Sequence, residues 1–182
     1  MILSTKFDIH MSLGSVHRYM KILNLRSIMK KMPENKGKDD IKKEEVQNPK
    51  TFANVLNRDF CTSEPGHKWL TDVTYIPCTD GTLFLSCIKD MFDKSIIAYY
   101  MSKRNDTELV MKTLYMAEHL IGENTILHSD QGSQYVSKEY QAYLKEKGIT
   151  GSMSRKGTPY DNSPMESFFS LLKNEELKLH GL

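Results

Sequence analysis

The clearest alternation of apolar and polar positions lies near the middle of the chain. Residues 70–76 alternate between the two faces of a strand, with Asp72 on one of them. Two more segments rich in β-forming residues follow closely, at 83–89 and 96–101, and Asp80-Gly81 is a hairpin signal between the first two. Strands this close in sequence pair antiparallel, so we expect a three-stranded meander.

After this meander the apolar spacing changes to the period of a helix. The expected elements are a helix capped by Asn105 or Asp106 and ended near Gly122, a strand at 125–129, a helix from Ser137 to Gly148, a strand at 149–153, a loop at 154–162 and a helix starting at Ser163-Pro164. This element order is that of the ribonuclease H-like fold. We predict an α/β protein in which helices flank a mixed five-stranded sheet.

The amino-terminal part of the chain has a different character. Residues 1–30 contain a short helical pattern from Val16 to Leu25, and residues 31–57 are expected to form a charged linker before a core domain at 58–182. Residues 1–50 hold 11 Lys and Arg against 6 Asp and Glu (net +5), which leaves 14 against 17 (net −3) for the rest. A basic arm on a mildly acidic body suits a protein that binds a polyanion and metal ions, although a solvated linker explains the arm too.

Composition places the chain among ordinary soluble proteins, with 39% hydrophobic and 26% charged residues. It contains no apolar run long enough to span a bilayer and no secretory leader, so we expect a cytoplasmic protein without a membrane partner. The cysteines, Cys61, Cys78 and Cys87, form neither a C-x-x-C pair nor an even set. We expect buried, reduced thiols and no disulfide or zinc site.

Three acidic residues stand where chemistry is plausible. Asp72 lies in mid-strand, Asp130 follows the strand at 125–129, and Glu166 lies in the first turn of the last helix. If that strand pairs beside the first, Asp72 and Asp130 are neighbours, and the last helix has to bring Glu166 over them. Carboxylate oxygens without His or Cys select Mg²⁺ or Mn²⁺. Two such ions about 3.5–4 Å apart support phosphoryl transfer.

Each carboxylate also has a purely structural explanation. With 23 acidic residues in the chain, spacing alone proves nothing. Ser163-x-x-Glu166 is a capping box, Asp130 could start a turn to Gly132, and Asp72 could lie on a surface edge strand. His128, beside Asp130, is expected to form structural hydrogen bonds, because a hard-cation site disfavours imidazole.

Three segments together resemble the catalytic motifs of integrase-like insertion-sequence transposases. They are HKWLTDVTY at 67–75, HSDQGSQY at 128–135 and DNSPMESFF at 161–169. Thirty-five residues separate Asp130 from Glu166, the spacing that names the D,D(35)E group. The best match is the transposase encoded by the second reading frame of the IS three family. The resemblance covers residues 58–182, while residues 10–32 resemble only the tail of that family's helix-turn-helix-like region.

The resemblance implies a core like that of retroviral integrases, in which Asp72, Asp130 and Glu166 form the catalytic, metal-binding triad for Mg²⁺ or Mn²⁺. It also implies a basic residue seven positions after the glutamate, where Lys173 stands. Seven residues are about two helical turns, which puts Lys173 on the same face roughly 10 Å along, near a DNA phosphate. Without the motif, Lys173 would be an ordinary solvated lysine.

The loop before the last helix is basic, contains a glycine and ends in an aromatic residue. Arg155 and Lys156 could hold DNA backbone there, and Tyr160 could stack on a base. The expected partners are therefore the element's terminal repeats and target DNA, bound by a homo-oligomer.

The resulting functional prediction is a transposase that cleaves element ends and transfers the 3′ hydroxyl into target DNA. An inactive DNA-binding or oligomerising remnant is the alternative from another class. A retroviral-type integrase should carry a His-His-Cys-Cys zinc module before the core, but His10 and His17 have no cysteine before Cys61. A ribonuclease H or resolvase would share the fold without these motifs. Family members continue beyond the position of Leu182, so we expect a chain truncated at both ends.

Overall fold

A computed structural model describes residues 13–23 and 51–177 of the chain. The chain divides into two compact units, Met1–Lys42 and Lys43–Leu182. The described part of the first unit is helix α2 (Leu13–Ile22), where a helix from Val16 to Leu25 was expected. Leu25 and residues 31–50 of the predicted linker lie outside the described residues. Within the described ranges, no helix is both long enough and apolar enough to cross a bilayer.

The second unit is built on the expected five-stranded sheet. Its strands are β1 (Lys68–Cys78), β2 (Gly81–Asp90), β3 (Ile96–Ser102), β4 (Ile126–Ser129) and β5 (Thr150–Met153). They lie in the order β3-β2-β1-β4-β5. The first three pair antiparallel, and β4 runs parallel to both β1 and β5, which makes the sheet mixed as predicted. Gly81 pairs with Cys78 at the hairpin turn and has φ of 137°, a conformation that favours glycine.

The helical elements are α3 (Thr107–Ala117), the 3₁₀ turn η1 (Glu118–Leu120), α4 (Lys138–Glu146), the 3₁₀ turn η2 (Pro159–Asn162), α5 (Ser163–Leu171) and the π-helical turn η3 (Leu172–Leu177). Asp106, one of two predicted caps, accepts a hydrogen bond from the third residue of α3, and Ser137 does the same for α4. The predicted end of α3 near Gly122 is wrong. The helix α3 ends at Ala117. Ile121 fits the apolar spacing of the helix because its side chain also packs against the core, although its backbone is extended.

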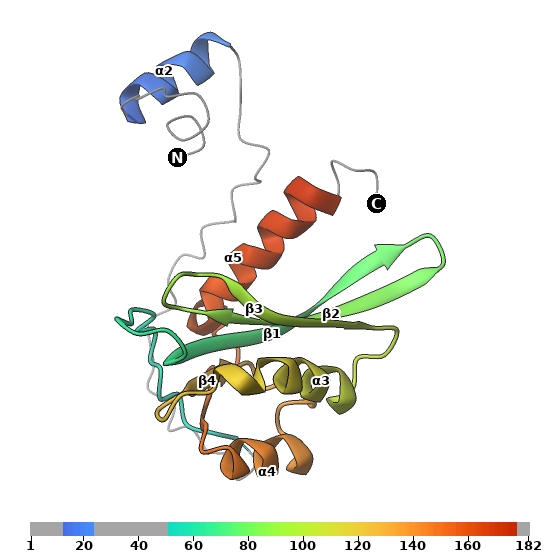
Figure 1. Ribbon diagram of the computed structural model, residues 1–182. Helices are drawn as coiled ribbons and strands as arrows, with labels where there is room; N and C mark the ends of the chain where they lie inside the picture. The colour runs from blue at the N-terminus through green and yellow to red at the C-terminus, as the bar shows by residue number, and fades with distance from the viewer. Residues whose placement is uncertain (1–12, 24–50, 178–182) are drawn as a thin grey trace. The chain divides into compact units, whose positions relative to one another are not determined.

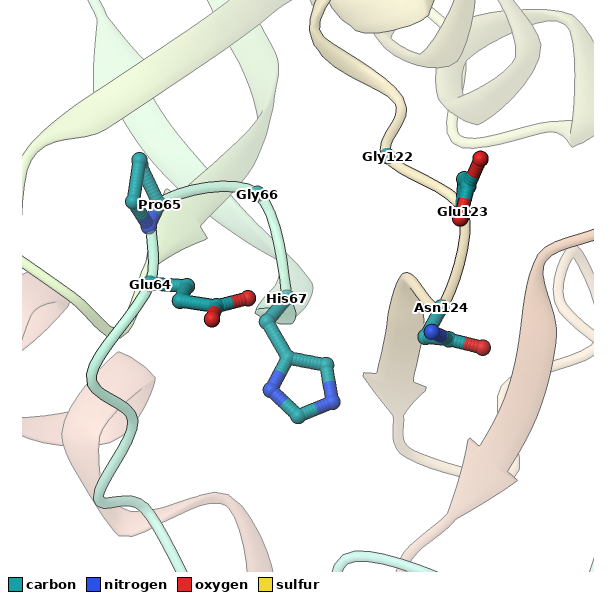
Figure 2. Close-up of a pocket in the computed structure, with 7 residues that line it drawn as sticks. All are labelled: Glu64, Pro65, Gly66, His67, Gly122, Glu123 and Asn124. Carbon is teal, nitrogen blue, oxygen red and sulfur yellow. The ribbon is translucent and has the colours of Figure 1, made fainter.

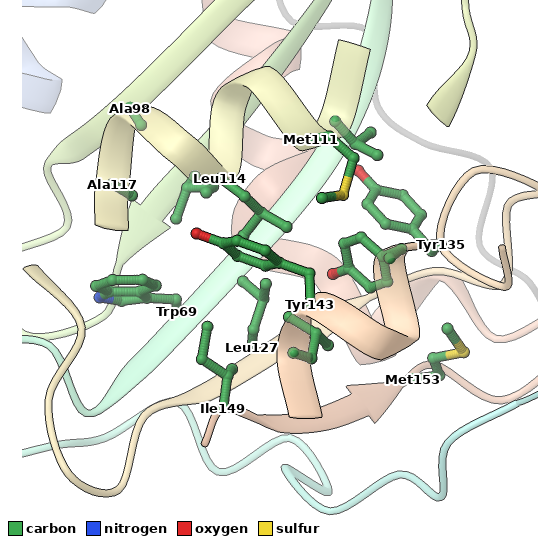
Figure 3. Packing of buried hydrophobic residues seen from close by; sticks show 14 residues of the cluster. Trp69, Ala98, Met111, Leu114, Ala117, Leu127, Tyr135, Tyr143, Ile149 and Met153 are labelled. Carbon is green, nitrogen blue, oxygen red and sulfur yellow. The ribbon is translucent and has the colours of Figure 1, made fainter. Parts of the chain in front are cut away.

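The helices lie in two layers around the sheet (Figure 1). Helices α3 and α4 cover one face, and α5 covers the other. Adjacent residues of β1 point into the two resulting cores, so that Trp69 packs with α3 and α4 while Leu70 packs with α5. Figure 3 shows the first core, to which Trp69 of β1, Leu114 of α3 and Tyr143 of α4 all contribute side chains. Strand β1 is thus covered on both faces and lies in the centre of the sheet.

Residues before position 58, the predicted start of the core domain, also contact the sheet. Residues 51–60, called the strap below, run beside β5. Met153 donates its backbone N–H to the carbonyl of Ala53 at 3.3 Å, and Ser152 Oγ accepts from the N–H groups of Val55 and Leu56 at 3.0 and 3.1 Å. Leu56 is 2% exposed. The apolar residues of the strap are too few and too widely spaced to stand out beside a polar linker, so the sequence alone does not reveal these contacts.

The cysteine prediction holds in part. All three thiols are free, as expected, and Cys87 is buried while Cys78 is half-buried. Cys61, however, is exposed, which contradicts its assignment as a buried hydrophobic residue. It lies in the irregular segment between the strap and β1, outside the sheet that buries Cys87.

Candidate active site

Asp72 and Asp130 come from two neighbouring parallel strands. In the pairing of β1 with β4, Lys68 lies opposite Ile126 and Leu70 opposite His128. Asp72 and Asp130 each stand two residues further along, so the same register carries both to the carboxyl end of β4. Because β1 is the central strand of the sheet, the interpretation of Asp72 as a surface edge residue is wrong. The expected pairing of the first and fourth strands is confirmed.

The electrostatic environment of Asp72 links it to the other two carboxylates. Burial, together with the negative charges of Asp130 and Glu166, raises the pKa of Asp72 to about 7. A backbone hydrogen bond from Val73 to Asp72 Oδ1, at 2.7 Å, and the positive charge of Lys173 act in the opposite direction. All three carboxylates and one ammonium group therefore share one neighbourhood, although Glu166 lies 94 positions after Asp72 in the sequence.

Asp130 forms the turn that its sequence suggested. Its Oδ1 accepts a hydrogen bond from the N–H of Gly132 at 2.9 Å, and a Cβ at Gly132 would lie only 3.0 Å from that oxygen. The turn uses one carboxylate oxygen and orients the side chain. A turn and a ligand role are therefore compatible at this position.

Glu166 lies in the first turn of α5 and is exposed, and partial desolvation raises its pKa. The predicted capping box is absent. Ser163 is the first residue of α5, and its N-cap, Asn162, makes no side-chain capping hydrogen bond. The predicted helix start at Ser163-Pro164 is confirmed, but the 3₁₀ turn η2 runs directly into α5, so Ser163 is already helical and does not act as the N-cap. A capping box therefore does not explain the glutamate at position 166.

The donor set at this site suits a hard divalent cation. It consists of carboxylate oxygens that repel one another, and a cation would offset the repulsion that Asp72 experiences. In residues 13–23 and 51–177, no three His, Cys, Asp or Glu side chains already stand close enough to form a metal cluster.

Lys173 does not occupy a regular α-helical position. It belongs to η3, the π-helical turn that follows α5, so the two-turn spacing used for the prediction does not apply. Its ammonium nitrogen lies 3.9 Å from the centroid of the Tyr75 ring on β1. Desolvation lowers the pKa of Lys173, while the charge of Asp72 raises it. Lys173 thus stands near Asp72.

The loop before α5 is organised by Asp161, which the sequence analysis overlooked. The Arg155 side chain donates to both carboxylate oxygens of Asp161, at 2.8 and 2.9 Å, and Arg58 Nε donates at 2.7 Å. Asn54 of the strap adds a hydrogen bond at 2.9 Å. The Asp161 side chain is fully buried, and these bonds outweigh its desolvation and hold its pKa well below the usual range. No sequence signal pointed to this pair, because the pairing rules of helices and strands do not relate residues six positions apart.

Three residues of this loop, Arg155, Lys156 and Tyr160, were predicted to contact DNA, and they differ in exposure and pairing. The Arg155 side chain, 38% exposed, pairs with Asp161, whereas Lys156 and Tyr160 are exposed on the same loop. Two arginines share one carboxylate at Asp161, which leaves the cluster with a net positive charge.

His128 forms structural hydrogen bonds, as predicted. Its Nδ1 lies 2.8 Å from Ser152 Oγ and its Nε2 lies 3.0 Å from Ser154 Oγ. Burial lowers the pKa of His128 to about 4, so the ring is neutral at physiological pH. The imidazole connects β4 to β5 and to the loop that leads to α5.

A separate cavity lies at the other end of the parallel strands. It has a volume of about 330 Å³ and is lined by residues 64–67 and 122–124. Figure 2 shows the His67 ring between these two loops. The loops immediately precede β1 and β4, so the cavity lies at the amino ends of these strands, away from Asp130. Ligand sites of α/β sheets lie at the carboxyl ends, which favours the carboxylates as the functional site.

Comparisons with known proteins agree with this site. The integrase core domain family matches residues 62–159. A transposase-like protein of Haemophilus influenzae is 48% identical over 123 residues, covering 67% of this chain and 57% of the relative. The transposase for IS904 of Lactococcus lactis is 45% identical over 125 residues, covering 67% and 49%. Transposase InsF for IS3A of Escherichia coli is 42% identical over 130 residues, covering 70% and 44%. The chain thus spans about half the length of these curated relatives.

Solved structures show the same fold. The simian T-cell lymphotropic virus intasome in complex with a PP2A regulatory subunit contains a chain with a TM-score of 0.57 and 22% identity, over 62% of this chain and 40% of that one. The HTLV-2 integrase catalytic core domain in complex with magnesium, in its trimeric form, matches with a TM-score of 0.50 and 19% identity, over 65% and 76%. The expected likeness to retroviral integrase cores and to IS3-type transposases is confirmed. Because the family match spans 98 of 182 residues, this chain belongs to the integrase core domain family.

Proposed function

We propose that this chain is the catalytic part of an insertion-sequence transposase, a DDE-type polynucleotidyl transferase. It would cleave DNA at the ends of the element and join the exposed 3′ hydroxyl to target DNA. The observation that supports this most directly is the electrostatic coupling of Asp72 to both Asp130 and Glu166. A half-buried carboxylate held near two other negative charges is unfavourable for folding, so the placement of Asp72 favours a functional role. The transposase names of the relatives point the same way.

We further propose that Asp72, Asp130 and Glu166 together bind Mg²⁺ or Mn²⁺, as two ions. The HTLV-2 integrase core named above was solved with magnesium, which supports this assignment. When bound, divalent ions would activate the attacking oxygen and stabilise the leaving oxygen at phosphorus. The protein contributes position, because β1 fixes Asp72, the turn to Gly132 orients Asp130, and α5 carries Glu166.

The basic and aromatic residues around the triad are proposed to hold DNA. Lys156 and Tyr160 are exposed and suit contact with a phosphate and stacking on a base. Arg155 would contribute through the positive charge that remains at its cluster with Asp161. Lys173 would bind a phosphate beside the carboxylates. In this proposal the chain works in the bacterial cytoplasm as a homo-oligomer on terminal-repeat and target DNA.

A cleavage assay tests the function. The full chain is incubated with Mg²⁺ and DNA that carries the ends of the element flanking its gene. Wild type is compared with Asp72→Asn and with Asp80→Asn, a matched change in an ion pair whose two side chains are 74% and 75% exposed. We expect metal-dependent nicking by wild type and Asp80→Asn and none by Asp72→Asn. Equal DNA binding without cleavage by any of the three would instead identify the chain as a DNA-binding remnant.

A further inference from the structure

Helix α5 begins differently from the other helices of the core. The N-cap residues of α3 and α4 have extended backbones, and their side chains accept hydrogen bonds from the first turn. At α5 the N-cap is Asn162, with φ of −124° and ψ of 28°, and its side chain makes no capping bond. The preceding turn η2 supplies a hydrogen-bond acceptor for one N–H group at the helix start, because Ser163 donates its N–H to the carbonyl of Tyr160. The Asn162 side chain is therefore not needed as a cap.

Asn162 instead binds the strand that carries Asp72. Its Nδ2 donates to the backbone carbonyl of Thr71 at 3.2 Å, a buried hydrogen bond across 91 positions of sequence. Asn162 is only 4% exposed, and its Oδ1 is buried with no hydrogen-bond partner among the described residues. An asparagine that neither caps its helix nor satisfies its own oxygen is costly for stability. Such local costs are typical of functional positions.

The contact with Thr71 sets the distance between two of the proposed catalytic residues. Thr71 immediately precedes Asp72, and Asn162 stands one helical turn before Glu166, about 6 Å along the axis. Met165 is completely buried against the same face of the sheet, which prevents the helix from turning about this contact. A shift at Asn162 would therefore move Glu166 relative to Asp72.

We infer that Asn162 is a positioning residue, whose amide, bound to the Thr71 carbonyl, fixes the first turn of α5 so that Glu166 stays beside Asp72. Its effect on cleavage rests on the proposed function, but its effect on the arrangement of the carboxylates does not. Asn162 needs no contact with DNA or metal for this role. Its loss should weaken cation binding and slow cleavage, while DNA affinity is retained.

The test uses the full chain in four forms: wild type, Asn162→Ser, Asn162→Thr and the control Asn105→Ser. Asn105 is exposed beside the N-cap of α3 and belongs to no part of the site. Serine and threonine cannot reach Thr71, and threonine fills more of the space if the serine variant fails to fold. Mn²⁺ affinity is measured by water-proton relaxation, DNA affinity by fluorescence anisotropy, nicking in single turnover and folding by thermal unfolding.

We expect both Asn162 variants to bind Mn²⁺ about 10–100-fold more weakly than wild type, the usual effect of losing a residue that orients metal ligands. The nicking rate should fall by a comparable factor, DNA affinity should stay within about twofold, and Asn105→Ser should match wild type. Unchanged Mn²⁺ affinity in a folded Asn162 variant overturns the inference. A wild type that binds Mn²⁺ but never nicks DNA refutes the transposase proposal alone, and one that binds no Mn²⁺ overturns both.

Discussion

Replacing Asp72 by Asn should stabilise the metal-free protein while it removes activity. Burial and the neighbouring carboxylates raise the pKa of Asp72 from 3.8 to about 7, so the ionised side chain disfavours folding. A shift of about three units at about 1.4 kcal/mol each gives an upper limit of about 4 kcal/mol. Asparagine has almost the same shape, and its Oδ1 can still accept the bond from Val73, so little packing is lost. We expect a gain of about 2–4 kcal/mol above neutral pH.

The sign of the pH dependence follows from the raised pKa of Asp72. Between about pH 4 and 7 the unfolded chain has lost this proton and the folded chain retains it. The stability of wild type therefore decreases as the pH rises through this window, and Asp72→Asn escapes the loss. The difference between the two proteins should be close to zero near pH 4 and should reach its full value above pH 7.

Urea unfolding in the presence of a chelator measures this difference at several pH values. Asp80→Asn is the matched control, because its ion pair with Lys103 is exposed and contributes less than about 1 kcal/mol. Adding Mn²⁺ should raise the midpoint for wild type more than for Asp72→Asn. The reasoning is refuted if Asp72→Asn is no more stable than wild type at about pH 8, or if the difference does not vary with pH.

Three further substitutions probe the surroundings of the triad. Asp161→Asn should cost about 3 kcal/mol in urea unfolding, because it leaves two partly exposed arginines without their buried carboxylate, and a cost below about 1 kcal/mol would contradict this. Gly151→Ala should cost about 1–3 kcal/mol by the same measurement, since its Cβ would lie 2.6 Å from the Phe52 ring; an unchanged midpoint would show that the strap yields freely. Between about pH 6.5 and 4 only the unfolded chain protonates His128, so stability is lost as the pH falls. His128→Gln, made in the Asp72→Asn background, should make this loss less steep, and an equally steep loss would argue against the reasoning.

The sheet and the pairing of Asp72 with Asp130 could be predicted because local signals determine them. Alternation defines β1, the turn at Asp80-Gly81 fixes the hairpin, and the short connections force the meander. Once the element order implies that β4 lies beside β1, the two aspartates have to be neighbours. The start of α5 at Ser163 was predicted correctly. Errors occurred at the end of α3 and in the capping box proposed for α5, where a 3₁₀ turn adjoins the helix, because apolar spacing does not distinguish an α-helix from a 3₁₀ turn.

The contacts that hold the site together could not be predicted, because they join segments far apart in sequence. Asp161 binds Asn54 and Arg58 across more than 100 positions, and no sequence pattern near Asp161 predicts these partners. Arg155 was assigned to DNA on its charge alone, but its guanidinium is bound to Asp161. A basic residue beside a catalytic helix is equally able to bind nucleic acid or to hold the loop, and only the fold distinguishes the two.

The third motif, residues 161–169, combines one exposed carboxylate with several buried anchors. Asp161 is fully buried on the strap side, Asn162 is buried against β1, and Met165 and Phe169 pack into the core beneath α5. Glu166 alone among these five is exposed. A carboxylate at the end of a flexible side chain can hold a cation only if its backbone is fixed, because a displacement of about 1 Å is enough to lose most of the effect. The length of the motif therefore reflects the number of contacts needed to fix one glutamate, and substitutions at its buried positions should affect cation binding more than DNA binding.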